Sequence, residues 1–392
     1  MRFKNHVNAV IICLFSLILV ACTNNLNNEI SDNEVLVVNE PSTESTTNSI
    51  DFVSLEDRIE DFEFLYEVIV SSYPYLEINK ERYSTDFEAN YQVYLSAVKE
   101  VQSQQEFSEA ISRMLDDLHS DHAYVSIDTQ NYSFEMPYDK IPNYAKPLFR
   151  DVIPEQVGYV KLPMMYGQGF IEADRERTYD YLMSIKDYDV LIIDVRKCPG
   201  GTVGYWSEFL MPLILSEPDQ IELNYLLKDS FHVKEQLDAN LKELETLDLL
   251  AEKIPNLSQT LINEYEGFYT WNIEILPDPE SVEFQGELYL LIDQYTYSAA
   301  DAFSLYAKQS DLFTLVGEAT AGGGMDQPAT FKLPNSEIEV VIPIALGINN
   351  DGSIHETTGT LPDVVVDFPF QRDNLKYDPC ILKVLELEEI NF

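Results

Sequence analysis

The sequence is short of several residue types, and each shortage excludes a class of protein. Only 25 basic residues stand against 68 acidic ones, and the resulting net charge of −43 repels phosphate backbones, which argues against nucleic-acid binding. Four cysteines and 15 glycines are too few for a disulfide scaffold or a collagen-like chain. Hydrophobic residues nevertheless make up 45% of the sequence, enough to bury the core of one large domain or two ordinary ones.

The N-terminus predicts an export signal. Arg2 and Lys4 precede a short, mostly apolar run, as in a secretory signal peptide. The run ends in the letters LVAC, which resemble a bacterial lipobox whose cysteine, here Cys22, becomes the lipidated mature N-terminus. An uncleaved membrane anchor is the alternative, because the run is of borderline length. We expect residues 1–21 to be removed and the chain to be held by its lipid on the extracytoplasmic face of the cell membrane.

Composition and periodicity divide the remaining chain into three parts. Residues 22–50 are rich in Asn, Ser, Thr and Glu without an aromatic residue, which predicts a disordered tether. Residues 51–120 carry apolar side chains at helical spacing and predict a helical subdomain. Residues 121–392 contain short apolar runs bounded by Gly, Pro and Asp, typical of buried strands in an α/β domain. Within that part, we expect residues 205–285 to form a long helical and irregular excursion from the α/β pattern.

Two adjacent glycines follow one of these predicted strands. In IIDVRKCPGG the strand is followed by Gly200 and Gly201. Such glycines let backbone N–H groups point into a cleft, as an oxyanion hole requires. The alternative is an ordinary strand-to-helix turn.

Ser298 and two histidines are the other candidates for chemistry. Ser298 opens a predicted helix in TYSAADAF, where a serine either caps the helix or acts as a nucleophile stabilised by the helix N-terminus. His119 and His122 lie three residues apart. They could share a metal ion, but no further ligand lies at metal-site spacing, so one of them acting as a general base is the better interpretation.

Together these segments resemble the S41 family of serine peptidases, which includes the C-terminal processing peptidases and the tricorn core protease. TYSAAD matches the family's nucleophile motif, LVGEATAGGG and GTLPDVVVDF match in kind and order, and the resemblance covers residues 54–368. It implies a crotonase-like spiral β core with helices behind the helical N-terminal subdomain. It also implies that Ser298 is the nucleophile, that His122 is the base and that Glu356 orients His122. Backbone N–H groups of Gly200 or Gly201 and of Ala299 would form the oxyanion hole.

The sequence also departs from one branch of that family. C-terminal processing peptidases pair their serine with a lysine after the GE-T strand, whereas this chain has three glycines there. The tricorn-like Ser-His-Glu branch therefore fits better, with His355 a weaker candidate for the base. About 35 residues separate His122 from the strand GYVKL, too few for an inserted PDZ domain. The resemblance requires no metal and no cofactor.

The sequence as a whole predicts a lipid-anchored serine peptidase that hydrolyses peptide or protein substrates. An inactive binding lipoprotein of the same fold and a hydrolase of non-protein acyl substrates are the alternatives. Oligomeric state is left open. Cys198 and Cys380 could form a disulfide or remain free thiols.

Overall fold

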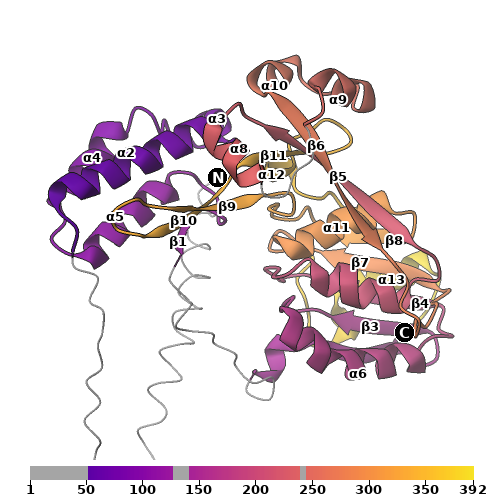
Figure 1. Cartoon of the computed structure of the whole chain (residues 1–392). Helices are drawn as coiled ribbons and strands as arrows, with labels where there is room; N and C mark the ends of the chain where they lie inside the picture. The colour runs from indigo at the N-terminus through magenta and orange to yellow at the C-terminus, as the bar shows by residue number, and fades with distance from the viewer. Residues whose placement is uncertain (1–51, 127–140, 239–243) are drawn as a thin grey trace, which may run out of the picture. The chain divides into compact units, whose positions relative to one another are not determined.

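The computed structural model describes residues 52–126, 141–238 and 244–392 (Figure 1). The predicted signal peptide, Cys22 and the predicted tether lie outside these residues. Within the described ranges no helix is both long enough and apolar enough to cross a membrane. The division into a helical subdomain and a catalytic domain at residue 120 stays a prediction.

The described chain begins with four helices. The first starts at a capping box, in which the Ser54 hydroxyl accepts a hydrogen bond from the Asp57 N–H and the Asp57 carboxylate accepts one from the Ser54 N–H. The last starts at Ser103, whose hydroxyl accepts a hydrogen bond from the Glu106 N–H. The helices are α2 (Leu55–Ser72), α3 (Leu76–Tyr83), α4 (Tyr91–Glu100) and α5 (Gln104–Asp116). All four lie within residues 51–120, where the spacing of apolar side chains predicted helices.

A six-stranded sheet forms the centre of the α/β part, with the strand order β12-β8-β7-β4-β3-β2. All neighbouring pairs are parallel except β2 with β3. The strands of this sheet are β2 (Leu148–Ile153), β3 (Val157–Lys161), β4 (Val190–Asp194), β7 (Glu287–Ile292), β8 (Phe313–Gly317) and β12 (Val364–Val365). The α/β fold expected from the apolar runs is confirmed.

Helices cover both faces of this sheet, which explains why its strands are apolar on both sides. Ile192 of β4 packs in a cluster with α13 (Pro379–Leu387), whereas the next residue, Ile193, packs in the cluster that contains α6 (Gln168–Ser184) and α11 (Ala299–Gln309). The second cluster also contains core residues of the N-terminal helices. The helical part and the α/β part therefore share one hydrophobic core.

Two three-stranded antiparallel sheets complete the fold, in the orders β11-β5-β6 and β1-β10-β9. Their strands are β1 (Tyr124–Ser126), β5 (Asp219–Leu227), β6 (Gly267–Ile275), β9 (Pro328–Lys332), β10 (Glu339–Pro343) and β11 (Ala345–Ile348). The remaining helical segments are a 3₁₀ turn (Asn143–Ala145), a π-helical turn (Tyr205–Leu210), α7 (Met211–Ile214), α8 (Phe231–Asp238), α9 (Leu247–Lys253), α10 (Gln259–Glu264), α12 (His355–Thr358) and a second 3₁₀ turn (Leu375–Tyr377).

The long β5–β6 pair corrects the expectation of a helical and irregular excursion over 205–285. Helices do occupy the connection between the two strands, but the strands pair along nine residues each. In β5, Ile221, Leu223 and Tyr225 are buried and alternate with more polar residues. This period of two is the signal of a strand, and it was masked by the helical segments around it.

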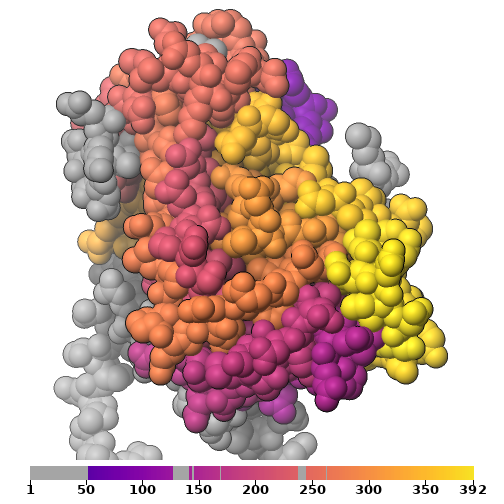
Figure 2. Space-filling view, turned by 90° about the vertical axis from the view of Figure 1, so that its right-hand side faces the viewer, coloured from indigo at the N-terminus to yellow at the C-terminus, as the bar shows by residue number. Residues whose placement is uncertain are grey.

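A buried ion pair fixes the C-terminal helix to the central sheet. Arg196, directly after β4, lies 2.7 Å from Asp194 and 2.9 Å from Asp378, the N-cap of α13. The C-terminal residues, yellow in Figure 2, lie against the magenta segment that contains β2 and α6. Cys198 and Cys380 are free thiols, and burial raises the pKa of each to about 12.

Candidate active site

Ser298 lies in a strained turn between β7 and α11. Its backbone φ is 54°, a region that residues other than glycine rarely occupy, and such strain is concentrated at functional sites. Asp293 organises this turn by accepting hydrogen bonds from the N–H groups of Lys197 and Tyr295. The Ser298 N–H donates to the Gly322 carbonyl at 3.2 Å. The Ser298 side chain makes no capping hydrogen bond, so the interpretation as a simple N-cap fails.

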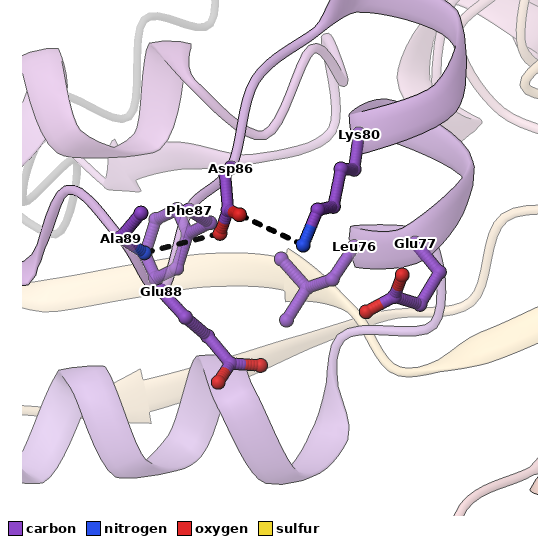
Figure 3. A pocket seen from close by; sticks show the side chains of 7 residues that line it. All are labelled: Leu76, Glu77, Lys80, Asp86, Phe87, Glu88 and Ala89. Carbon is purple, nitrogen blue, oxygen red and sulfur yellow. Dashed lines mark hydrogen bonds and ion pairs between the residues drawn. The ribbon is translucent and has the colours of Figure 1, made fainter.

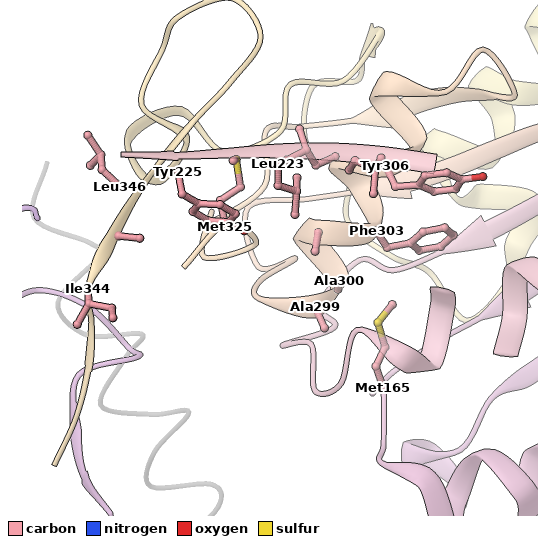
Figure 4. Packing of buried hydrophobic residues seen from close by; sticks show 14 of the residues in the cluster. Met165, Leu223, Tyr225, Ala299, Ala300, Phe303, Tyr306, Met325, Ile344 and Leu346 are labelled. Atoms are coloured by element: carbon pink, nitrogen blue, oxygen red, sulfur yellow. The ribbon is translucent and has the colours of Figure 1, made fainter. Parts of the chain in front are cut away.

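The helix behind Ser298 is deeply packed. Ala299, Ala300, Phe303 and Tyr306 of α11 are buried in the cluster that also holds Leu223 and Tyr225 of β5 and Met325, as Figure 4 shows. A close-packed helix cannot shift easily. The first turn of α11 therefore holds Ser298 in a fixed position.

His122 contacts Ser298 directly. Its Nε2 atom lies 3.2 Å from Ser298 Oγ. The imidazole stacks on the ring of Tyr297, with ring centroids 5.1 Å apart and an angle of 25° between the ring planes. The side chain is 19% exposed, so the ring remains accessible. His119, by contrast, binds Thr85 Oγ1 through Nε2 at 2.8 Å, and the two histidines do not share a site.

The other ring nitrogen of His122 binds Asp326 and not Glu356. Nδ1 of His122 lies 2.8 Å from Asp326 Oδ2, and the Tyr75 hydroxyl donates to Asp326 Oδ1 at 3.0 Å. The structure therefore corrects the expectation that Glu356 receives the hydrogen bond of His122. The Asp326 side chain is 1% exposed. Asp326 lies two residues after the three glycines that stand where the C-terminal processing peptidases have their lysine.

Glu356 lies beside the nucleophile turn instead. Its Oε2 accepts a hydrogen bond from the Gly323 N–H at 3.0 Å. Burial, followed by the negative charge of Asp326, raises the pKa of Glu356 well above its ordinary value. This environment favours the neutral form of the Glu356 carboxyl group, because two adjacent buried carboxylates repel each other.

Two of the predicted oxyanion-hole residues, Gly200 and Ala299, lie next to Ser298, and Gly201 follows Gly200 in the sequence. Gly200 has φ 97°, and a Cβ atom there would lie 2.7 Å from the Ala299 nitrogen and 2.8 Å from Ser298 Cβ. Met165 pairs with this loop by donating to the Gly200 carbonyl at 2.9 Å. Across the described part of the chain, the N–H groups of Gly201 and Ala299 have no hydrogen-bond partner. Two uncommitted donors beside a serine can stabilise an oxyanion.

The two lysines that follow Ser298 within 40 residues, Lys308 and Lys332, form ion pairs of their own. The Lys308 ammonium group pairs with Asp363, and that of Lys332 pairs with Glu337 at 3.2 Å. Both side chains are thus engaged elsewhere. The base that contacts Ser298 is an imidazole.

A surface hollow of about 330 Å³ lies away from these residues, between α3 and the segment before α4 (Figure 3). Its lining residues are Leu76, Glu77, Lys80, Asp86, Phe87, Glu88 and Ala89. Lys80 and Asp86 neutralise each other at 2.7 Å. The hollow holds neither Ser298 nor His122, and we assign the chemistry to the serine site.

Comparison with known proteins identifies the family. The model of peptidase family S41 matches residues 156–366, more than half of the chain. The chain belongs to peptidase family S41. Ser298, Asp326 and Glu356 fall inside the matched region, and His122 precedes it.

Several known proteins resemble parts of the chain at lower sequence identity. A protein of Chlamydia pneumoniae is 22% identical over 255 residues, which is 55% of this chain and 40% of that protein. The tricorn protease of Thermoplasma volcanium is 28% identical over 103 residues, 26% of this chain and 10% of that protein. The matched stretches thus span less than half of either curated relative. The crystal structure of a putative peptidase from Parabacteroides merdae shares the fold, with a TM-score of 0.55 at 17% identity, covering 86% of this chain and 98% of that one.

Proposed function

We propose that this S41 family member is a serine peptidase that acts through Ser298, His122 and Asp326. Family membership supports peptidase function. The observation that carries the residue assignment is the continuous hydrogen-bonded path from Ser298 Oγ through the His122 ring to Asp326 Oδ2, with steps of 3.2 Å and 2.8 Å. A serine, an imidazole and a buried carboxylate in that order form a nucleophile, a base and a group that orients the base.

In the acylation step, Ser298 Oγ attacks the carbonyl carbon of the scissile peptide bond while His122 Nε2 takes the hydroxyl proton. Asp326 accepts the hydrogen bond of His122 Nδ1–H, which holds the tautomer with a free Nε2 and stabilises the imidazolium that forms. The N–H groups of Gly201 and Ala299 stabilise the oxyanion, aided by the N-terminus of α11.

The intermediate then collapses. His122 returns its proton to the leaving amine, and the acyl group remains on Ser298 as an ester. A water molecule, deprotonated by His122, attacks this ester. His122 then returns the proton to Ser298 Oγ, and the second product leaves with a new carboxyl group. Glu356 takes no proton in this sequence: it binds the Gly323 N–H and so steadies the turn whose Gly322 carbonyl holds the Ser298 backbone.

We place the enzyme on the outer face of the cell membrane, anchored through a lipid on Cys22. The support is the signal-like sequence that ends in LVAC. Metabolic labelling with radioactive palmitate tests this placement. Label should enter the wild-type chain and be absent from Cys22→Ser, and equal labelling of both would refute the anchor.

Cleavage of a peptide library by the full chain tests the catalytic proposal. Wild-type protein should release new N-termini, and Ser298→Ala should lower the rate by at least about 10³-fold while remaining folded. Equal cleavage by the two would refute the assignment of Ser298. A wild-type chain that binds peptides but cleaves none would instead be the inactive binding protein, and one that hydrolyses only other acyl compounds would be a different hydrolase.

A further inference from the structure

A second buried charged pair lies directly behind the serine. Asp301, in the first turn of α11, is fully buried and only three residues from Ser298. Its carboxylate accepts four hydrogen bonds from two other segments of the chain, 320–324 and 355–360. The donors are Thr320 Oγ1 at 2.5 Å, Thr360 Oγ1 at 2.8 Å, the Gly324 N–H at 2.9 Å and His355 Nε2 at 2.6 Å.

The partners of His355 determine where its protons are. Nδ1 lies 2.8 Å from Asn349 Oδ1. The amide orientation of Asn349 is fixed, because its Nδ2 donates to the hydroxyls of Ser353 and Thr358, whose own protons go to other acceptors. Nδ1 therefore carries a proton, and Nε2, facing the Asp301 carboxylate, carries another. His355 is a buried imidazolium ion paired with Asp301.

This ion pair joins the segments that build the proposed active site. Asp301 binds the segment Gly322–Asp326 in its middle, through the Gly324 N–H. At one end of that segment, the Gly322 carbonyl accepts a hydrogen bond from the Ser298 N–H. At the other end, the Asp326 carboxylate binds the His122 ring. The position of the segment therefore affects the nucleophile and the base at the same time.

We propose that the Asp301–His355 ion pair is a positioning pair that holds Ser298 and Asp326 in register, and that it does so only while His355 is protonated. The proposal rests on the function proposed above. Neither side chain needs to touch the substrate. The pair fixes the segment between two groups that do the chemistry, and a misplacement of about 1 Å there is enough to slow catalysis about 10²-fold.

The proposal implies an alkaline limit to Ser298 reactivity. The charged groups around His355 are Asp301 in contact and Asp326 nearby, with Glu356 next in sequence. Burial by itself would lower the pKa of His355, but the charge and hydrogen bond of Asp301 outweigh it and raise the pKa above its ordinary value. The proton is therefore lost at a higher pH than from an ordinary histidine, and its loss leaves the Asp301 carboxylate buried without a counter-charge.

The rate at which a fluorophosphonate labels Ser298 in the full chain, measured across the pH range, tests the proposal. The wild-type rate should fall under alkaline conditions. His355→Gln should label at least about 10-fold more slowly near neutral pH and lack the alkaline fall. His119→Asn, a matched histidine change outside the network, should keep the wild-type profile. A folded His355→Gln that labels within about twofold of wild type, with the same alkaline fall, would overturn the proposal.

A spectroscopic measurement on the wild-type chain keeps the proposal testable if His355→Gln does not fold. Nitrogen-15 NMR of the five histidines should find one imidazole with both nitrogens still protonated above the ordinary histidine pKa of about 6.5. Its absence would refute the buried imidazolium. Failure of the wild-type chain to label at Ser298, with this signal present, would instead refute the proposed function alone.

Discussion

His122 Nδ1 lies 2.8 Å from Asp326 Oδ2, so the imidazole that contacts Ser298 is held by an aspartate from the segment after three glycines. The second oxygen of that aspartate binds the hydroxyl of Tyr75, which precedes α3. The N-terminal helical part thus contributes to the site, in addition to packing against the α/β part. Two buried carboxyl groups lie in this region and bind different partners. Asp326 binds the His122 ring, and Glu356 binds the Gly323 N–H.

Replacing Asp326 by asparagine should nearly abolish activity. The amide has the same shape but no charge, and its NH₂ group can turn the His122 ring to the wrong tautomer. We expect kcat to fall by about 10³- to 10⁴-fold with little loss of stability. Steady-state peptide cleavage together with a thermal melt measures both, and a loss of less than about 10-fold would show that Asp326 does not orient the base.

Replacing Glu356 by glutamine should be mild by comparison. Because burial and the charge of Asp326 raise the pKa of Glu356 well above its ordinary value, the protonated form of this carboxyl group is favoured, and an amide imitates that form. We expect kcat within about 10-fold of wild type. If Glu356→Gln is instead as damaging as Asp326→Asn in the same assay, Glu356 acts as an ionised group and the two roles are reversed.

The same substitution should change how stability depends on pH. An acid whose pKa is higher in the folded than in the unfolded chain binds more protons when folded, so the free energy of unfolding falls as pH rises from about 4.3 toward the raised value. Glutamine does not titrate and removes this contribution. Denaturant unfolding between about pH 5 and pH 8 should therefore show a smaller loss of stability for Glu356→Gln than for wild type. Parallel curves would contradict the raised pKa.

Gly200→Ala should block the site. The residue has φ 97°, and an added Cβ atom would lie 2.6 Å from the Tyr297 carbonyl oxygen and 2.7 Å from the Ala299 nitrogen. We expect kcat/KM to fall at least about 10²-fold, because the oxyanion donors cannot keep their places. Gly169→Ala is the matched control, since nothing lies within 4 Å of a Cβ atom there. Equal activity of the two variants would show that Gly200 does not contribute to the active site.

The sequence predicted the parts of the fold and site that local patterns encode. Apolar runs bounded by turn residues identified the central strands, and the motif around Ser298, together with the resemblance, led to His122. Each of these signals lies within about a dozen neighbouring residues.

Asp326 could not be found in this way. It is one of 68 acidic residues, and nothing around it differs from an ordinary turn. Its role depends on the close approach of three segments distant in sequence, which bring it to His122 and to Tyr75. The pairing of Asp301 with His355 was hidden for the same reason, because their burial and shared hydrogen bond exist only in the folded chain. The sequence had offered His355 only as a weaker candidate for the base.

Mass-spectrometric mapping of a fluorophosphonate adduct on the full chain tests the central claim most directly. The account predicts one adduct per chain, on Ser298, lost in Ser298→Ala and formed at least about 10³-fold more slowly in His122→Ala. An adduct on any other residue, or labelling of Ser298 that proceeds equally fast without the His122 ring, would contradict it.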